Sequence, residues 1–285
     1  MTQPAARKAE PAISDEDFSR FREFFYRKTG IMFADNKRYF VDKRLRERMA
    51  ACNVPAFHDY FNLARYQANG GELQLLVNAM TVNETYFYRE EYQFHCLVES
   101  ILPEVTRSRR NGDAVRIWTI PCSTGEEAYS IAFQLLDHWR RVDDFAVEIV
   151  ASDIDTKVLE RARRGVYGER ALQYVPKATI ARYMRPVGEG VYQVIPEIRD
   201  SITFVQTNLA DALSTARFRG FDVVFCRNLL IYFDDMSRRE AAETIFEVLR
   251  PGGFVCLGHS ESMSRVSSLF DVCKFPNAIV YQKPS

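Results

Sequence analysis

The sequence has little histidine, and its cysteines lie far apart. Its four histidines are scattered, and its six cysteines form no CxxC pair. Because a structural zinc site draws its ligands from such residues at short, regular spacings, we expect no metal centre. Several cysteines lie in apolar runs typical of buried strands, where a thiol acts as a small hydrophobic side chain. These features indicate a reduced, cytoplasmic protein.

Net charge and long apolar segments are also missing. The 38 basic residues balance 38 acidic ones, which argues against a nucleic-acid-binding protein that depends on bulk positive charge. No apolar run approaches the roughly 18–20 residues that span a bilayer, and the polar start of the chain has no signal-peptide core. With 285 residues and 47% hydrophobic content, the chain is long enough for two soluble domains.

The first part of the chain has the periodicity of helices and no strand pattern. Residues 1–12 are expected to form a disordered tail. Ser14 is typical of a helix start, Gly30 of a helix end, and Asp35 of a cap for the next helix. The pattern predicts an all-helical domain over residues 13–82. Its predicted helices are 14–29, 36–51, 57–68 and 73–80.

Strands then alternate with helices, which implies parallel pairing and right-handed crossovers. The predicted fold class is α/β, with a doubly wound, mostly parallel sheet over residues 98–285 and an inter-domain linker at 83–97. Residues 166–207 break the rhythm, and we expect a small antiparallel β insertion whose strands 191–194 and 202–205 form a hairpin. The predicted strands of the main sheet are 115–120, 147–152, 221–226, 254–258 and 278–282. The predicted helices are 127–139, 156–164, 176–184 and 237–249.

The loop after the first predicted strand, 121–127, indicates the kind of ligand. Ligands of an open parallel sheet bind beyond the carboxyl ends of its strands. The loop has Gly125 alone where a dinucleotide fingerprint has three glycines, and it carries Glu126 and Glu127 where a pyrophosphate needs a neutral or positive cradle. These glutamates disfavour NAD and favour a ligand with a positive amine or sulfonium, such as S-adenosylmethionine. A tight strand-to-helix turn would explain the loop alone about as well.

Polar residues follow two further predicted strands. Asp153 is placed to accept hydrogen bonds from ribose hydroxyls, although capping a helix, the role we expect for Asp155, is an alternative. Arg227 and Asn228 follow a strongly apolar strand, where buried polar groups are costly without specific partners. In α/β methyltransferases this position lines the methyl-transfer site. Together these strand ends predict a site for S-adenosylmethionine.

Five motifs follow one another along the chain: NETYFYRE at 83–90, CSTGEE at 122–127, ASDID at 151–155, FCRN with IYF at 225–233, and GHSE at 258–261. In this order and spacing they resemble the chemoreceptor glutamate methyltransferases, the CheR family. The resemblance runs from about residue 14 to the end of the chain.

The resemblance implies an activity and a set of site residues. The activity is methyl transfer from S-adenosylmethionine to a glutamate carboxylate of a bacterial chemoreceptor. Arg89 and Tyr232 stand where the family places groups near the transferred methyl and the incoming carboxylate. Glu127 matches the partner of the methionine amine, and Asp153 matches the ribose ligand. The implied cofactor-binding residues are Asn83, Thr85, Arg89, Glu127, Asp153, Asn208, Leu209, Arg227 and Asn228.

This chemistry needs no general base. A glutamate with a pKa of about 4.3 is already ionised near neutral pH, and a sulfonium is a strong electrophile. Catalysis should come from in-line positioning and exclusion of water, and a hydroxyl with a guanidinium suits the orientation of a carboxylate. We therefore predict no essential histidine and a structural role for His259.

A basic helix indicates the substrate face. Residues 37–48 contain six basic and two acidic side chains, and Lys37, Arg44 and Arg48 share one stripe. A solvated face is the usual explanation, and an anionic second messenger or a nucleic-acid backbone would also fit. The resemblance implies that the stripe attracts the glutamate-rich helical bundle of a chemoreceptor's cytoplasmic domain. We predict that these three residues, Arg44 foremost, bind substrate and that nucleic acid is not a partner.

The resemblance raises a second receptor contact. In some members the β-subdomain binds the receptor's C-terminal pentapeptide as an extra strand. Here the connection at 186–190 is short, so we expect no such binding. We also expect no membrane insertion, and we assume a monomer. Two other functions remain open. A methyltransferase for a small molecule or RNA would leave residues 83–89 unexplained, and a non-catalytic S-adenosylmethionine-binding regulator would require lost pocket residues.

Overall fold

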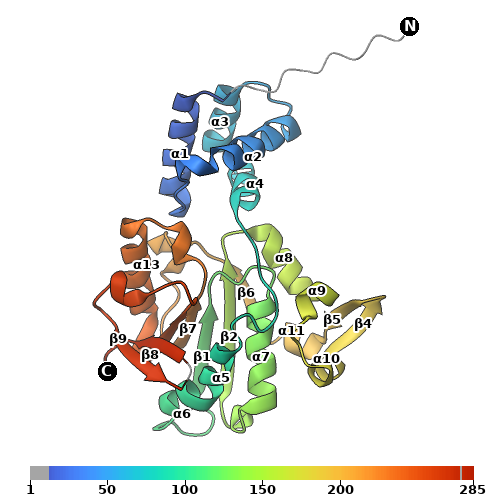
Figure 1. Cartoon of the computed structure of the whole chain (residues 1–285), viewed down its shortest axis with the longest axis vertical. Helices are drawn as coiled ribbons and strands as arrows, with labels where there is room; N and C mark the ends of the chain where they lie inside the picture. Colours follow the sequence, from blue (N-terminus) through green and yellow to red (C-terminus); the bar gives the residue numbers. More distant parts are fainter. Residues whose placement is uncertain (1–12, 277) are drawn as a thin grey trace. The chain divides into compact units, whose positions relative to one another are not determined.

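The computed structural model describes residues 13–276 and 278–285, and these described residues form two compact units, divided between Thr81 and Val82 (Figure 1). The expected disordered tail, residues 1–12, lies outside the described residues. None of the helices within the described ranges is long and apolar enough to cross a membrane.

The first unit is helical, and its first helix begins and ends where local chemistry predicts. Ser14 accepts a hydrogen bond from the backbone N–H of Asp17 at 3.1 Å and completes a capping box, and Gly30 ends the helix with φ 75°. The predicted cap at Asp35 is wrong, because this carboxylate accepts a hydrogen bond from Arg22 at 2.6 Å and the next helix starts at Arg38. The helices are α1 (Asp15–Thr29), α2 (Arg38–Ala51), α3 (Phe57–Tyr66) and α4 (Gly71–Met80), with a 3-10 turn at Asp35–Lys37.

Apolar side chains at helical spacing form the core of this unit. Val41, Leu45 and Met49 on α2 are fully buried, as the apolar stripe of the sequence predicts. Phe21 and Phe25 pack beside each other on α1, with ring centroids 5.5 Å apart. Hydrophobic burial along these faces holds the helices together.

The second unit is built on a seven-stranded sheet with the order β6-β2-β1-β7-β8-β10-β9. The neighbouring strands β6, β2, β1, β7 and β8 pair in parallel, and β10 pairs antiparallel with both β8 and β9. The α/β fold class with a mostly parallel sheet is therefore confirmed. The strands are β1 (Ala114–Thr119), β2 (Ala146–Asp153), β6 (Ile202–Gln206), β7 (Phe221–Cys226), β8 (Leu249–Leu257), β9 (Asp271–Phe275) and β10 (Ala278–Gln282).

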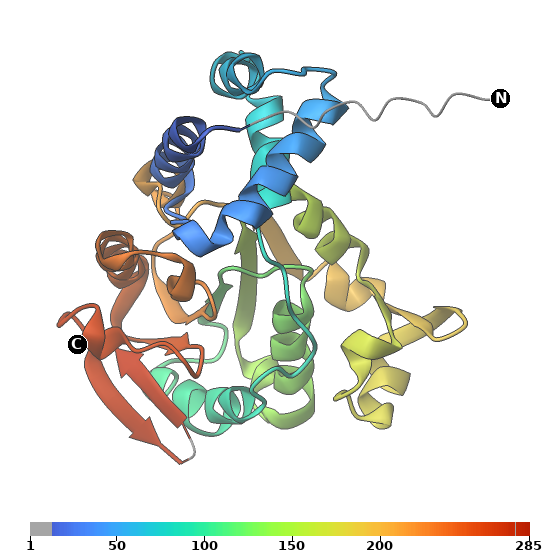
Figure 2. The ribbon, with the colours of Figure 1, turned by 45° about the horizontal axis from the view of Figure 1, so that its top comes forward.

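Helices cover both faces of this sheet, and Figures 1 and 2 show α7 and α13 on opposite sides of the strands. On one face Phe94 stacks on Phe225, with centroids 6.1 Å apart; on the other, Trp118 stacks on Phe218 at 4.8 Å. Alternate residues of each strand thus serve two cores. The main helices are α5 (Tyr92–Cys96), α6 (Leu102–Val105), α7 (Glu126–His138), α8 (Thr156–Arg164) and α13 (Asp235–Val248), with short turns α9 (Glu169–Leu172), α11 (Pro196–Arg199) and α12 (Ala212–Thr215).

The predicted hairpin between 191–194 and 202–205 is wrong. A small antiparallel sheet exists, but its order is β3-β5-β4, formed by β3 (Val166–Gly168), β4 (Met184–Gly188) and β5 (Val191–Val194), beside α10 (Lys177–Tyr183). The segment at 202–206 is β6, which pairs in parallel with β2 in the main sheet. Two features decide this pairing. The turn α11 begins at Pro196 and separates the strands, and Phe204 is buried with its ring 5.7 Å from that of Tyr129 on α7.

Candidate functional site

Left-handed backbone conformations gather at the carboxyl edge of the main sheet. Among the described residues other than glycine, φ is positive at Tyr88, Glu90, Ser123 and Asn228, as well as at Asn53 in the first unit. Ser123 follows β1, Asn228 follows β7, and the other two lie in the segment that enters the second unit. Such conformations cost about 1–3 kcal/mol each and persist where the surroundings enforce them, often at functional sites. This edge is therefore the candidate active site.

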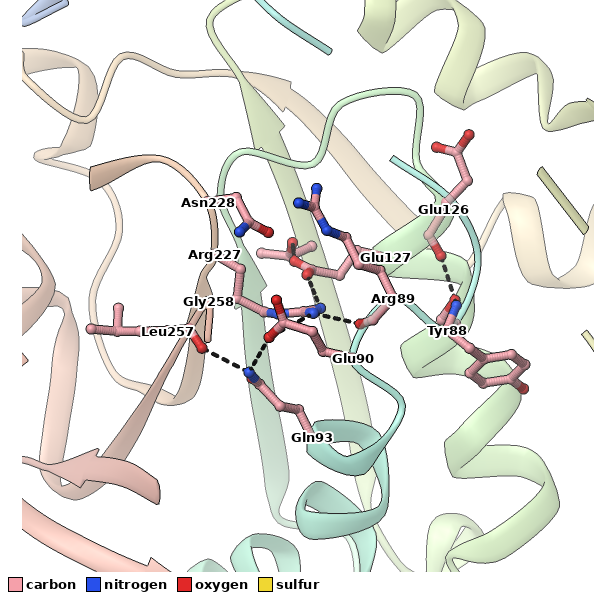
Figure 3. A network of polar contacts seen from close by, with 12 residues as sticks. Tyr88, Arg89, Glu90, Gln93, Glu126, Glu127, Arg227, Asn228, Leu257 and Gly258 are labelled. Carbon is pink, nitrogen blue, oxygen red and sulfur yellow. Dashed lines mark hydrogen bonds and ion pairs between the residues drawn. The ribbon is translucent and has the colours of Figure 1, made fainter. Parts of the chain in front are cut away.

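A buried guanidinium lies at the centre of this edge (Figure 3). The Arg227 side chain is 2% exposed and forms ion pairs with Glu127 at 2.6 Å and Glu90 at 3.3 Å. It also donates a hydrogen bond to the backbone carbonyl of Arg89, and the Thr119 hydroxyl donates to Glu127. The network joins β1, β7, α7 and the segment before α5.

The network carries one more negative charge than positive. Burial opposes the charge on Arg227, but the Glu127 and Glu90 carboxylates outweigh it and raise the pKa of the guanidinium. Burial also favours the neutral form of Glu90, but Arg227 and His259 hold the pKa of that carboxyl below its usual range. Two acidic side chains therefore share one guanidinium, a balance that suits a cationic ligand.

Asp153 lies at the end of β2 and is 3% exposed. Its two oxygens accept hydrogen bonds from the backbone N–H groups of Ser123 at 2.8 Å and Asp155 at 2.9 Å. Burial raises its pKa to about 6. The carboxylate thus orders two strand-end loops, and Asp155 caps α8 through the N–H groups of Lys157 and Val158, as predicted.

Two hydroxyls beside Asp153 are buried without a hydrogen-bond partner among the described residues. They belong to Ser123, after β1, and Thr207, after β6. The Thr207 N–H donates to the Asp153 backbone carbonyl at 3.0 Å, and the Ser123 N–H donates to its carboxylate at 2.8 Å, so both residues lie next to Asp153. Because a buried hydroxyl without a partner costs about 1–3 kcal/mol, these groups fit a ligand with polar atoms at this position, such as a ribose.

The other predicted cofactor residues lie around the same edge. Asn83 donates a hydrogen bond to Asp155 at 2.9 Å, and Thr85 is half-buried nearby in sequence. After β6, Asn208 accepts a hydrogen bond from the N–H of Ala210 at 3.1 Å, and Leu209 is buried. Each of these residues belongs to the second unit.

Arg89 and Tyr232, the predicted catalytic pair, lie within electrostatic range of each other. Burial raises the pKa of the Tyr232 hydroxyl, and the Arg89 guanidinium acts in the opposite direction. Arg89 donates a hydrogen bond to the carbonyl of Glu84 at 2.8 Å and lies over the Tyr86 ring, 6.0 Å from its centroid. In Figure 3 the Arg89 and Asn228 side chains lie on the same side of the Arg227 guanidinium.

Two family models match the chain. The model described as CheR methyltransferase, SAM binding domain, matches residues 83–279, and the model described as CheR methyltransferase, all-alpha domain, matches residues 16–81. The chain belongs to the CheR family. The resemblance drawn from the five motifs is therefore confirmed.

Curated relatives match nearly the full length of this CheR chain. It is 50% identical to chemotaxis protein methyltransferase 2 of Vibrio cholerae serotype O1, across 96% of this chain and 95% of the relative. It is 35% identical to the chemotaxis protein methyltransferase of Escherichia coli K12, across 91% and 88%. It is 39% identical to chemotaxis protein methyltransferase 2 of Pseudomonas aeruginosa, across 89% of each. This CheR protein is thus an S-adenosylmethionine-dependent methyltransferase.

The sequence did not predict a functional role for three residues of the CheR site. Glu261 accepts hydrogen bonds from the N–H groups of Asn228 at 2.7 Å and Gly258 at 2.9 Å, and so holds the loop after β7. Glu90 is the second acid on Arg227, and Gln93 donates to Glu90 at 2.8 Å. Glu90 and Glu261 stand inside the quoted motifs, but only the folded contacts distinguish them from neighbouring surface acids.

The predicted substrate residues of the basic helix have different surroundings. Arg48 forms a two-pronged ion pair with Glu72, at 3.0 and 2.7 Å, and Glu72 also accepts from the Tyr60 hydroxyl at 2.8 Å. These contacts assign Arg48 to the stability of the helical unit. Arg44 has a pair with Glu47 at 2.8 Å and a partly exposed side chain. Lys37 is exposed and lies in the 3-10 turn before α2 rather than on the helix.

Metal ligands do not gather at this edge. Within residues 13–276 and 278–285, His, Cys, Asp and Glu side chains form no group of three that could hold a metal ion. His259 contacts Glu90, with its Nδ1 2.9 Å from the carboxylate.

Proposed function

We propose that this CheR protein transfers the methyl group of S-adenosylmethionine to glutamate side chains in the cytoplasmic helical bundle of chemoreceptors. The matched family domain supports S-adenosylmethionine as the cofactor, and the relatives named chemotaxis protein methyltransferase support a role in chemotaxis. The single observation that carries the proposal is the Arg227 network, in which Glu127 and Glu90 leave a net negative charge beside the predicted catalytic pair. That charge suits a sulfonium bound within reach of Arg89.

The cofactor would contact four strand ends. Glu127 still has free lone pairs for the methionine amine, and Asp153 with the hydroxyls of Ser123 and Thr207 would receive the ribose. Asn208 and Leu209 would border the adenine, Asn83 and Thr85 would close the entering segment over the cofactor, and Asn228 would complete the pocket. In this assignment Arg227 is a positioning group, because its guanidinium already contacts Glu127, Glu90 and the Arg89 carbonyl.

The reaction requires no proton transfer. A carboxylate oxygen of the substrate glutamate forms a bond to the methyl carbon while the carbon–sulfur bond breaks and sulfur keeps the electron pair. The products are a methyl ester and S-adenosylhomocysteine. The protein's own contribution is alignment and exclusion of water, with Arg89 and the Tyr232 hydroxyl holding the carboxylate in line.

The receptor would meet the exposed basic side chains of the helical unit. Lys37 is exposed, and Arg44 is partly exposed with a surface pair to Glu47, so both could meet glutamate-rich helices, whereas Glu72 occupies Arg48. Charge attraction of this kind speeds association and depends on salt. We propose a cytoplasmic monomer that contacts the receptor bundle directly.

The small sheet offers little for a receptor pentapeptide. The residues between β4 and β5 are Glu189 and Gly190, a two-residue turn. We therefore propose that receptor recognition does not depend on a tethering pentapeptide. Calorimetry of the full chain with such a peptide should detect no binding, and low-micromolar affinity would contradict the proposal.

The direct test is transfer of labelled methyl from S-adenosylmethionine to a panel of receptor cytoplasmic domains. Label released as methanol by mild base identifies a glutamate methyl ester. The Arg89→Ala variant should lose transfer and keep its fold by circular dichroism. Base-stable label, or transfer only to RNA or a small molecule, would favour the second function, and cofactor binding without transfer to any receptor would favour a regulator.

A further inference from the structure

Glu90, the residue after Arg89, contacts Arg227, His259 and Gln93 through one carboxylate. We propose that Glu90 is a positioning residue, which acts on methyl transfer by fixing the backbone that directs the Arg89 side chain. This inference rests on the role proposed for Arg89 in holding the substrate carboxylate.

The backbone around Arg89 is held in a conformation that it would not choose alone. Tyr88 has φ 58° and Glu90 has φ 59°, so two left-handed residues bracket Arg89. Relaxation of either residue to negative φ would turn the Arg89 side chain in another direction. The Tyr88 N–H donates to the Ser130 hydroxyl at 3.0 Å, and the Arg89 carbonyl accepts from Arg227. These two contacts fix the entry and the middle of the turn.

The Glu90 carboxylate fixes the exit of the turn. It is 11% exposed and contacts Arg227 at 3.3 Å, the His259 Nδ1 at 2.9 Å and the Gln93 amide at 2.8 Å. Gln93 donates a further hydrogen bond to the carbonyl of Leu257 at 2.7 Å, at the end of β8. One carboxylate thus joins the segment before α5 to the ends of β7 and β8.

The charge of Glu90 matters because Arg227 is shared. The guanidinium donates to Glu127, contacts Glu90 and also holds the Arg89 carbonyl. If Glu90 becomes neutral, Glu127 is the remaining carboxylate of the pair, and the guanidinium gains freedom to shift toward it. The Arg89 carbonyl then loses a fixed donor, and the left-handed turn at 88–90 loses the contacts that offset its strain.

The test compares Glu90→Gln with Glu91→Gln in the full chain. Glu91 is the adjacent acid, its side chain is 59% exposed, and its ion pair is a 3.7 Å contact with His95. We expect Glu90→Gln to lower kcat for receptor methylation about tenfold or more, because small misplacements of a catalytic group are costly. The affinity for S-adenosylhomocysteine, whose sulfur carries no positive charge, and the receptor KM should stay within roughly threefold. Glu91→Gln should match the wild type.

A merely structural role would give another pattern, in which cofactor affinity and melting temperature fall together with kcat. That pattern, or an unchanged kcat in Glu90→Gln, would overturn the inference. A second readout uses Arg89→Lys: because Glu90 acts through Arg89, adding Glu90→Gln should lower kcat by less than roughly threefold further. If the two substitutions instead lower kcat by independent factors that multiply, the inference is also overturned. Failure of the proposed function differs from both, since the wild type would then give no base-labile label on receptors.

Discussion

A single carboxylate, Asp153, illustrates how burial sets the pH range in which a site residue changes its charge. The side chain is 3% exposed, and it accepts hydrogen bonds from the backbone of Ser123 and Asp155. Burial outweighs these contacts and raises its pKa to about 6. The residue is therefore ionised at neutral pH but changes charge within the range in which most proteins stay folded.

We expect the affinity for S-adenosylhomocysteine to fall at low pH. If ribose hydroxyls donate to the ionised Asp153, protonation competes with the ligand, so affinity is full well above pH 6 and falls by about tenfold per pH unit well below it. Calorimetry between pH 5 and pH 7.5 would measure this, roughly spanning the titration of the group. In Asp153→Asn the affinity should be lower at neutral pH and nearly independent of pH. A wild-type affinity that stays constant down to pH 5 would contradict the assignment.

Gly258 provides a second test at the residue scale. A Cβ built there would lie 2.7 Å from the Asn228 side-chain nitrogen and 2.9 Å from the Glu261 carboxylate. We therefore expect Gly258→Ala to displace the loop after β7, at a cost of about 1–3 kcal/mol, and to lower methyl transfer more than tenfold. Gly168→Ala is the matched control, since a Cβ there meets nothing within 4 Å. Equal activities of the two variants, measured by the labelled-methyl assay, would argue against a fixed loop.

The basic side chains of helix α2 have two kinds of surroundings. Arg48 pairs with Glu72, which is 5% exposed, while Arg44 pairs with Glu47 at the surface. A surface pair of this kind contributes at most about 1 kcal/mol. Removal of one partner of a buried pair is far more costly, because the other charge stays buried.

The two arginines should therefore respond differently to truncation. Arg48→Ala should reduce the protection of α2 and α4 backbone amides from hydrogen exchange by about 3 kcal/mol. Arg44→Ala should change protection by less than about 1 kcal/mol and instead raise the receptor KM, more strongly at low salt. Similar exchange profiles for the two variants would show that the Glu72 pair is not structural.

At the scale of the whole molecule, the predicted cofactor residues and the predicted receptor residues belong to different units. The predicted cofactor residues, the first of which is Asn83 and the last Asn228, surround the carboxyl edge of the sheet. Lys37 and Arg44 lie in the helical unit. Each unit has its own apolar core. The division predicts that cofactor binding and receptor binding can be separated.

We expect a fragment of residues 82–285 to bind S-adenosylhomocysteine within roughly threefold of the full chain, because the second unit contains the complete carboxyl edge. Its receptor KM should rise at least about tenfold, since the basic side chains are lost. Calorimetry and the labelled-methyl assay measure the two quantities. A folded fragment that binds no cofactor would show that the helical unit contributes to the site.

Local patterns predicted the elements whose boundaries depend on neighbouring residues. Ser14 and Gly30 delimit α1 through their own backbone preferences, and the apolar run at 221–226 forms β7 at the predicted residues. Asp153, Glu127 and Asn228 could be assigned to one edge because parallel strands bring their carboxyl ends together. The family of the chain was also accessible from its motifs.

Tertiary contacts decided the rest. The strand at 202–206 pairs with β2 because Phe204 is buried beside α7, a partner that no local pattern specifies. Arg48 and Arg44 look equivalent in the sequence, and only the position of Glu72 separates them. Glu90 and Glu261 became functional candidates for the same reason. The sequence by itself determined which elements form and what chemistry they carry, since these depend on short-range propensity and residue type. The tertiary structure decided which side chain meets which, because that depends on burial between segments far apart in the chain.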